Sequence, residues 1–212
     1  RLRPIDPDRD LWFQTETVRN LVSELTVPLI GFAGAPFTLA AYLVEGRPSR
    51  EYVHVKSLMM GDPELWHRLC DRLADLAIAT LTAQVDAGAS AIQLFDSWVG
   101  ALHPEHYRRF VAPHSERILA TMADRGVPCI HFGINSGELL DQMAAPGVAC
   151  VGVDWRTPLA AARARTGGRV ALQGNLDPAL LLAPWPAVEA MRLRRAATSG
   201  RTEPARITPR VS

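Results

Sequence analysis

The chain contains 212 residues, with 23 Lys and Arg residues against 22 Asp and Glu residues, so its formal net charge is only +1. This balance excludes the strong basic excess that is typical of nucleic-acid-binding domains. Hydrophobic residues make up 48% and charged residues 21% of the sequence, which excludes an intrinsically disordered chain and predicts a globular protein with a buried core.

The sequence shows no sign of a membrane or secretory segment. No apolar run reaches the roughly 18 residues that a spanning helix needs, and the opening residues lack the apolar stretch of a signal peptide. The three cysteines, Cys70, Cys129 and Cys150, are widely spaced and form no C-x-x-C pair, which indicates small buried side chains rather than a disulfide framework or zinc cluster. These features predict a cytoplasmic protein that binds neither membranes nor nucleic acids.

The first part of the chain predicts three helices around one short strand. Apolar residues recur with a helical period near the start, and the pair Asp62-Pro63 supplies an N-cap and a first-turn proline for a long helix. Gly46 is suited to end the helix expected over residues 36–44. In chain order we expect a helix over residues 11–25, a strand over 29–32, a helix over 36–44 and a long helix over 63–88.

The rest of the chain predicts four more strands, each followed by helix. Pro104 and Pro113 suit helix starts, Gly126 suits a helix end, and Asn135 with Glu138 three residues later has the form of a capping box. In chain order we expect strands over residues 91–95, 129–132, 149–153 and 170–173, with helices from 104 and from 113, over 135–143, over 158–166 and after 177–178.

Five short strands, apolar on both faces and alternating with helices, predict an α/β protein with a helix-covered parallel sheet. Two architectures fit this pattern, an open doubly wound sheet and a stretch of a (β/α)8 barrel. No G-x-G-x-x-G follows a strand and no P-loop motif is present, which disfavours the dinucleotide-binding and nucleotide-binding versions of the open sheet.

Polar residues follow each predicted strand, at the sheet edge where parallel architectures bind ligands. His131 lies on a strand, where a hydrogen-bonded structural role is more common than catalysis. Tyr42 could be a core tyrosine, and the other residues could be helix caps or loop anchors. The spacing alone therefore indicates a polar site over the strand ends and names no reaction. The residues concerned are Tyr42, Ser97, Asn135, Asp154, Asn175 and Asp177.

Five motifs closely resemble the uroporphyrinogen decarboxylase family. The longest is P-L-I-G-F-A-G-A-P-F-T-L-A-A-Y-L-V-E-G over residues 28–46. The others follow in the family's order: A-G-A at 87–89, Q-L-F-D-S at 93–97, G-V-D-W at 152–155 and L-Q-G-N-L-D-P at 172–178. The resemblance covers residues 1–187 and includes several long motifs at matching spacing.

The resemblance implies the (β/α)8 TIM-barrel fold, here as an incomplete barrel of five parallel strands with covering helices. It also implies the family's reaction, which removes carboxyl groups from the four acetate side chains of uroporphyrinogen III to give coproporphyrinogen III in haem and porphyrin biosynthesis. The family needs no metal and no organic cofactor, and its members are usually homodimers. Protonation of the pyrrole ring beside the reacting acetate makes the substrate its own electron sink.

The resemblance assigns roles to two residues by their place in the motifs. Tyr42 matches the family's active-site tyrosine, which implies a catalytic and substrate-binding role. Ser97 matches a hydroxyl that contacts the substrate. Asp154 and Asn175 also fall in family motifs, and we expect them to act as structural loop anchors. No residue is expected to bind a metal.

Three segments of the family pattern do not occur in these 212 residues. They are R-Q-A-G-R, whose arginines hold substrate carboxylates, S-D-I, whose aspartate coordinates the pyrrole NH groups, and G-H-G, whose histidine lines the pocket. Three of the eight barrel strands are missing with them, and five parallel strands leave two open sheet edges. We therefore expect the isolated chain to fold poorly or associate, and to be inactive.

The final residues differ from the rest of the chain in composition. Residues 188–212 carry six arginines and scarcely any large apolar residue after Leu193. We therefore divide the chain into a partial uroporphyrinogen decarboxylase barrel over residues 1–187 and an atypical Arg-rich tail over 188–212, which is either disordered or out of frame.

Two other functions stay open. The first is a non-catalytic interaction module, in which a truncated barrel pairs with a partner or serves as a scaffold. The second is a related zinc-dependent methyltransferase, which binds zinc through a histidine, a cysteine two positions later and a further cysteine. Here His131 is followed by Phe132 and Gly133, so the expected thiol is missing.

Overall fold

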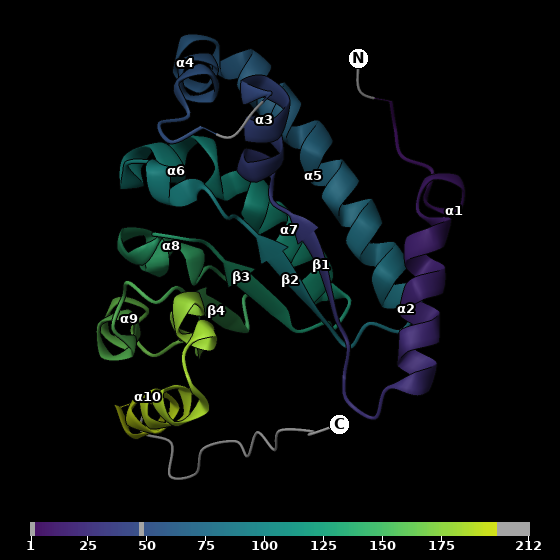
Figure 1. Cartoon of the computed structure of the whole chain (residues 1–212). Coiled ribbons are helices and arrows are strands. Elements are labelled where there is room, and N and C mark those ends of the chain that lie inside the picture. The colour runs from purple at the N-terminus through teal and green to yellow at the C-terminus, as the bar shows by residue number, and fades with distance from the viewer. Residues whose placement is uncertain (1–2, 47–48, 199–212) are drawn as a thin grey trace.

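The computed structural model describes residues 3–46 and 49–198, and its centre is one parallel sheet of five strands in the order β1-β2-β3-β4-β5 (Figure 1). Strands that are consecutive in the sequence pair with each other, so β1 and β5 lie at the two edges. This order matches a segment of a (β/α)8 barrel and rules out the doubly wound alternative for the described sheet, because a doubly wound sheet reverses its strand order. The strands are β1 Ile30–Gly34, β2 Ala91–Phe95, β3 Cys129–Phe132, β4 Cys150–Val153 and β5 Ala171–Gly174.

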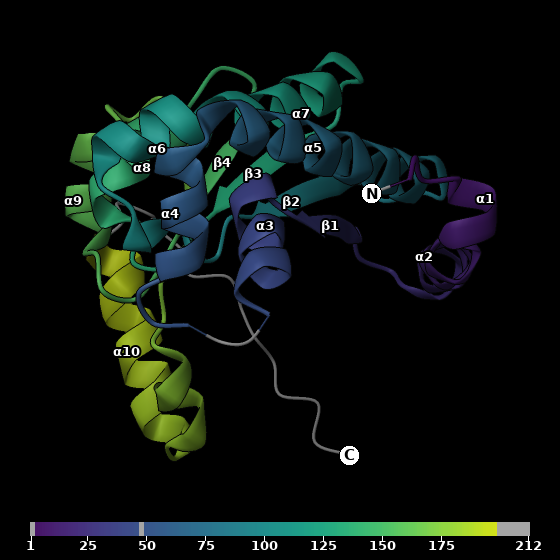
Figure 2. The ribbon, with the colours of Figure 1, turned by 90° about the horizontal axis from the view of Figure 1, so that it is seen from above.

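Helices connect the strands, and α5 and α7 lie together along one face of the sheet (Figure 2). The predicted pattern of helix after every strand is confirmed. The helices are α1 Pro7–Asp10, α2 Trp12–Glu24, α3 Pro36–Glu45, α4 Val53–Gly61, α5 Pro63–Asp86, α6 Pro104–Phe110, α7 Ala112–Asp124, α8 Leu140–Met143, α9 Leu159–Arg165 and α10 Trp185–Thr198, with 3-10 turns η1 Val99–Ala101, η2 Gly137–Leu139 and η3 Pro178–Leu182.

Several predicted helix boundaries are confirmed by their capping geometry. Asp62 accepts a hydrogen bond from the Leu65 amide at 3.0 Å and caps α5, followed by Pro63 in the first turn. Gly46 ends α3 in the left-handed conformation, at φ 63°. Helix α4 was not predicted, because its N-cap residue, Tyr52, has no capping side chain, and its first-turn amide at Val55 donates instead to the Glu45 carboxylate of α3, at 3.0 Å.

The predicted helix over residues 135–143 is wrong at its start. Asn135 has a φ of 55° and its amide donates to the Asp154 carboxylate, so it lies in a loop instead of capping a helix with Glu138. The chain then forms η2 and the short helix α8. The polar contact across the strand ends therefore overrides the local capping-box pattern.

The two faces of the sheet differ in burial. Ile92 and Leu94 point toward α5 and α7 and are fully buried in the main core cluster. A Cβ on Gly31 would come within 2.8 Å of Gln84 Oε1, so α5 approaches β1 closely on this side. On the opposite face, Phe32 is 61% exposed and Ile30 44% exposed. This second face is the one that forms the interior of a closed barrel.

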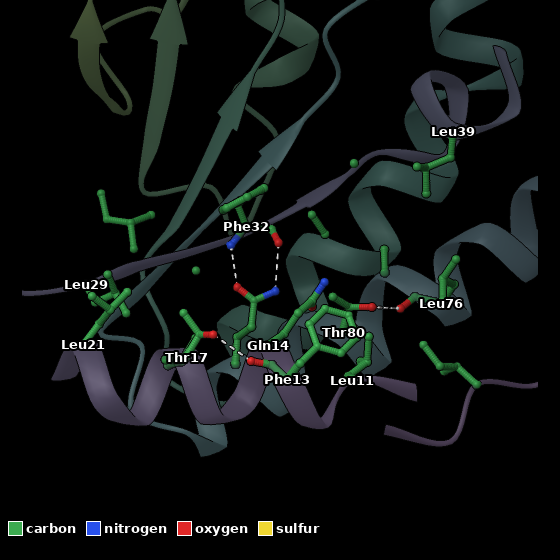
Figure 3. Close-up of a pocket in the computed structure, with 18 residues that line it drawn as sticks. Leu11, Phe13, Gln14, Thr17, Leu21, Leu29, Phe32, Leu39, Leu76 and Thr80 are labelled. Atoms are coloured by element: carbon green, nitrogen blue, oxygen red, sulfur yellow. Dashed lines mark hydrogen bonds between the residues drawn. The ribbon is translucent and has the colours of Figure 1, made fainter. Parts of the chain in front are cut away.

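Gln84 of α5 binds the outer edge of β1 with its side-chain amide. The Phe32 amide donates to Gln84 Oε1 at 2.8 Å, and Gln84 Nε2 donates to the Phe32 carbonyl at 2.9 Å (Figure 3). The Ala35 amide donates to the Phe95 carbonyl of β2. Backbone groups of successive residues in a strand point alternately to its two edges, and Phe32 lies three residues before Ala35. The backbone groups of Phe32 therefore point to the edge away from β2. The glutamine amide thus occupies the position of a neighbouring strand.

A groove of about 470 Å³ runs along this edge between α2, α5 and β1 (Figure 3). Its lining is largely apolar, with Gln84 and Gln14 among the few polar side chains. The main lining residues are Leu11, Phe13, Val18, Leu21, Leu29 and Leu76. The expected apolar surface is present at the β1 edge, but the backbone groups of Phe32 there are paired with Gln84 and are not left open.

Replacement of Gln84 by Met tests how much this contact stabilises β1. The variant leaves the Phe32 amide and carbonyl without the glutamine, so we expect the free energy of unfolding to fall by about 1–3 kcal/mol in urea denaturation. Thr80→Ala, also on α5, is the matched control, because the Thr80 hydroxyl bonds only to Leu76 of its own helix. Equal stability of the two variants would contradict the edge-binding role.

A histidine pair joins α5 to α7 on the outer layer. His67 Nδ1 lies 2.8 Å from His114 Nε2, and His114 Nδ1 lies 3.1 Å from the Asp71 carboxylate. Burial lowers the pKa of His114 below its usual value of 6.5, an effect that Asp71 opposes and His67 reinforces. The imidazole–imidazole hydrogen bond also needs one unprotonated ring nitrogen.

The lowered pKa of His114 predicts a loss of stability on acidification. As the pH falls below 6.5, His114 becomes protonated in the unfolded chain before it becomes protonated in the folded chain. The contribution of His114 to stability is therefore complete above pH 6.5 and is lost as the pH falls through its folded-state pKa. We expect wild type to lose more unfolding free energy between pH 7.5 and 5 than His114→Gln, measured in urea. His54→Gln, at an exposed site on α4, should behave as wild type.

Candidate active site

The loops at the carboxyl ends of the strands contact one another in sequence and form a continuous rim. The rim comprises α3, the β2 loop at residues 96–101, the β3 loop at 133–136, the β4 loop at 154–157 and the start of the β5 loop at 175. An aromatic contact joins α3 to the β2 loop, and a backbone contact joins the β2 loop to the β3 loop. Hydrogen bonds join the β3 loop to the β4 loop and the β4 loop to the β5 loop. The structure therefore places the predicted polar residues on one edge of the sheet.

Tyr42 lies on α3 with its side chain 62% exposed. The alternative of a core tyrosine is therefore wrong. The Tyr42 ring packs at 4.2 Å from the Trp98 ring, which also contacts Tyr52 at 5.4 Å between centroids. Trp98 directly follows Ser97, so this contact brings the two predicted site residues onto adjoining loops.

Ser97 is half-buried and lies two residues beyond the end of β2. Asp96, which precedes it, anchors the loop to the core. Asp96 is fully buried, and its carboxylate accepts a hydrogen bond from the Ser115 hydroxyl at 3.1 Å. The same carboxylate oxygen lies 3.5 Å from His131 Nε2. This buried polar group fixes the end of β2, and thereby the position of Ser97, against α7 and β3.

The β2 and β3 loops are packed backbone to backbone. A Cβ on Gly100 would collide with the carbonyl oxygens of Ile134 and Asn135, so only glycine fits there. Asn135 Nδ2 also lies within hydrogen-bonding distance of the Gly100 carbonyl, at 3.5 Å. This glycine is one of the residues that sequence reasoning missed, although its place after the Q-L-F-D-S motif was a usable signal.

Asp154 anchors the next two loops, as expected. Its carboxylate accepts from the Asn135 amide at 2.6 Å, from the Arg156 amide at 3.1 Å and from Arg156 Nη1 at 2.9 Å. Asn175 donates to the carbonyls of Asp154 and Thr157. Both Asp154 and Asn175 are buried, so the predicted structural roles of these two residues are confirmed.

A row of phenylalanines lies below the rim on the exposed face of the sheet. Phe32, Phe95 and Phe132 contact edge to face, with centroid separations of 5.7 and 5.6 Å. A Cβ on Gly152 would lie 2.6 Å from the Phe132 ring, so the ring covers this glycine of β4. Sequence reasoning missed this row, which could be found only by aligning three strands in register.

His131 points away from this face, into the helix-covered core. It is 1% exposed, and its Nδ1 lies 3.4 Å from the Met143 carbonyl. The structural interpretation of His131 is therefore confirmed. Among the described residues, no three His, Cys, Asp or Glu side chains are grouped to hold a metal ion, and the three cysteines are free thiols. Burial raises the pKa of Cys129 to about 11 and also raises the pKa of Cys150.

A singly wound parallel sheet, helices along one face and linked loops at the strand ends define a segment of a (β/α) barrel, an architecture that places binding sites at the carboxyl ends of its strands. Comparison with known proteins gives the family. A profile described as "Uroporphyrinogen decarboxylase (URO-D)" matches residues 1–205. The chain belongs to the uroporphyrinogen decarboxylase family.

Named relatives agree with this assignment. The uroporphyrinogen decarboxylase of Salinispora tropica is 57% identical over 208 residues, covering 98% of this chain and 56% of the relative. That of Streptomyces griseus is 57% identical over 190 residues, covering 89% of this chain and 52% of the relative. That of Mycobacterium tuberculosis is 58% identical over 199 residues, with coverages of 89% and 55%. The chain thus spans about half the length of the curated relatives it matches.

A solved structure shares the fold. A methyltransferase from Methanosarcina mazei superimposes with a TM-score of 0.76 at 20% identity, covering 88% of this chain and 55% of that chain. In the part of the chain that the structure describes, no helix combines the length and apolar character needed to cross a membrane. The predicted boundary at residue 187 stays a prediction: α10 crosses it, and residues 199–212 of the Arg-rich tail lie outside the described residues.

Asp154 should be the most sensitive residue of the rim. Asp154→Ala removes the acceptor of two loop amides and one guanidinium group, so we expect the free energy of unfolding to fall by about 2–3 kcal/mol. Asp177→Ala is the control, because Asp177 caps η3 at an exposed site through one amide and should cost about 1 kcal/mol. Thermal and urea unfolding of both variants give the comparison. A smaller loss for Asp154→Ala would contradict its anchoring role.

Proposed function

We propose that this chain supplies part of the substrate cradle of a uroporphyrinogen decarboxylase, the carboxy-lyase that converts uroporphyrinogen III to coproporphyrinogen III. Family membership, together with the rim that joins the Tyr42 and Ser97 loops through Trp98, is the observation that carries the proposal. Tyr42 acts in catalysis and substrate binding, and Ser97 binds substrate. Both residues lie in motifs of the family.

The chemistry of the site suits a tetrapyrrole. The phenylalanine row offers an apolar face for the macrocycle, and the Tyr42 and Ser97 hydroxyls offer hydrogen bonds at its border. The exposed Tyr42 side chain is free to meet a ligand, since its ring is supported by Trp98 on one side only in the described contacts. Decarboxylation through a protonated pyrrole would need no metal or organic cofactor, because the substrate itself accepts the electrons.

The isolated chain lacks several of the groups that this reaction needs. The arginines of R-Q-A-G-R, the aspartate of S-D-I and the histidine of G-H-G are not among its 212 residues. We therefore propose that the chain binds tetrapyrrole weakly and does not turn it over alone. The groove beside β1 is the place where the barrel sheet continues in a longer protein. A homodimer in the cytoplasm is the assembly and location that we propose for that protein.

A non-catalytic interaction module is the second candidate function. The apolar groove beside the β1 edge favours this alternative, because an apolar surface of this kind suits contact with a partner. A zinc-dependent methyltransferase is a weaker candidate, since the likeness to the Methanosarcina mazei structure shows the fold alone and His131 is buried on the helix side.

A binding and turnover assay with the purified chain tests the proposal. We expect the fluorescence of uroporphyrin to change on binding, and no coproporphyrinogen to form from uroporphyrinogen. Tyr42→Phe and Ser97→Ala should each raise the Kd about threefold to tenfold, because each removes one hydrogen bond. Ser23→Ala, at an exposed helical site, should leave the Kd unchanged. Absence of uroporphyrin binding would contradict the proposed function, and robust turnover would contradict the inactivity of the chain.

A further inference from the structure

Arg156 is the basic residue within the turns that directly follow the strands. The turns that directly follow the five strands contain residues 35, 96–98, 133–136, 154–157 and 175–177, and Arg156 is the only Lys or Arg among them. It lies three residues beyond the end of β4. A positive charge at the carboxyl ends of barrel strands lies where substrates of this architecture bind.

The Arg156 guanidinium is held in a fixed plane. Its central carbon lies 3.9 Å from the centroid of the Trp155 ring, and its Nη1 donates to Asp154 Oδ2 at 2.9 Å. Asp154 is itself buried and fixed by the Asn135 amide. Stacking and one ion pair therefore reduce the freedom that a long side chain would lose on binding a ligand.

The same guanidinium keeps unused donors at the surface. The Arg156 side chain is 47% exposed, and Nη1 to Asp154 is its one side-chain hydrogen bond in the described structure. Stacking on Trp155 occupies a face of the planar group and leaves the in-plane N–H groups accessible. A planar fork with free N–H groups is suited to a carboxylate, which it can bind through two parallel hydrogen bonds.

We propose that Arg156 binds a carboxylate side chain of the tetrapyrrole and acts as a specificity-determining residue, an inference that rests on the proposed function. Eight carboxylates on uroporphyrinogen require several cationic partners, and the apolar phenylalanine row cannot provide them. Arg156 provides one on the β4 loop, whereas Tyr42 lies on α3, which follows β1. The two residues thus contact different parts of one large ligand.

A purely structural role for Arg156 makes a different prediction. If the guanidinium only braced the Asp154 loop, its loss would weaken binding through a displaced loop and would leave the salt dependence of binding unchanged. Direct contact with a carboxylate adds one ion pair, so its loss must reduce the dependence of Kd on ionic strength. The two roles also differ in how far lysine can replace arginine, because the single ammonium group keeps the charge and loses the fork.

The test is a fluorescence titration of the full chain with uroporphyrin at several NaCl concentrations. The variants are Arg156→Gln and Arg156→Lys, with Arg125→Gln as the matched control. Arg125 is 40% exposed and also pairs with one aspartate, Asp86, at the amino end of β3, away from the rim. Thermal unfolding of each variant checks that the fold is kept.

We expect Arg156→Gln to raise the Kd roughly tenfold at low salt and to flatten its salt dependence. Arg156→Lys should retain the salt dependence and recover part of the affinity, and Arg125→Gln should match wild type. Wild-type binding with an unchanged Kd or an unchanged salt dependence for Arg156→Gln would overturn the role of Arg156 alone. Failure of the wild type to bind uroporphyrin would overturn the proposed function and this inference with it.

Discussion

Buried Asp154 links three of the five loops of the rim. One carboxylate binds the β3 loop through the Asn135 amide and its own loop through Arg156, while the Asp154 carbonyl receives the Asn175 side chain of the β5 loop. A buried carboxylate is tolerated only when hydrogen-bond donors surround it. The loops that meet at Asp154 therefore depend on one another for their positions. Three of the five strand ends are thereby fixed without any contact from the missing part of a barrel.

Aromatic and backbone packing extends this arrangement to the other two strand ends. The Tyr42 ring rests on Trp98, and Gly100 admits the β3 loop carbonyls at a distance that no other residue permits. Asp96, buried under the β2 loop, fixes the base of the same loop. Because every link joins neighbouring strand units, half of a barrel already contains the geometry of its own share of the site.

Much of the fold followed from local patterns, and the site followed from motifs. Caps such as Asp62 and Gly46 set helix ends through interactions within a few residues, which a sequence displays directly. Local patterns did not predict the strand order, because the doubly wound sheet and the barrel share the same alternation of strand and helix. The loop at Asn135 was predicted wrongly, since its deciding partner, Asp154, lies 19 residues further along the chain. The loop-anchoring contacts thus depend on tertiary proximity that local propensity does not encode.

The open face of the sheet fits the proposed division of the site between the hydroxyl of Tyr42 and the guanidinium group of Arg156. On the helix side, Ile92 and Leu94 are fully buried, whereas Phe32 on the other face is 61% exposed and packs edge to face against Phe95. In a closed barrel this face is interior, and a row of aromatic rings just below the strand ends forms a dry floor. In the proposed site, polar recognition is confined to the rim above this floor, at Tyr42 on α3 and at Arg156 on the β4 loop. A macrocycle with a charged periphery is complementary to the proposed division, because its rings can pack on the floor while its carboxylates reach the rim.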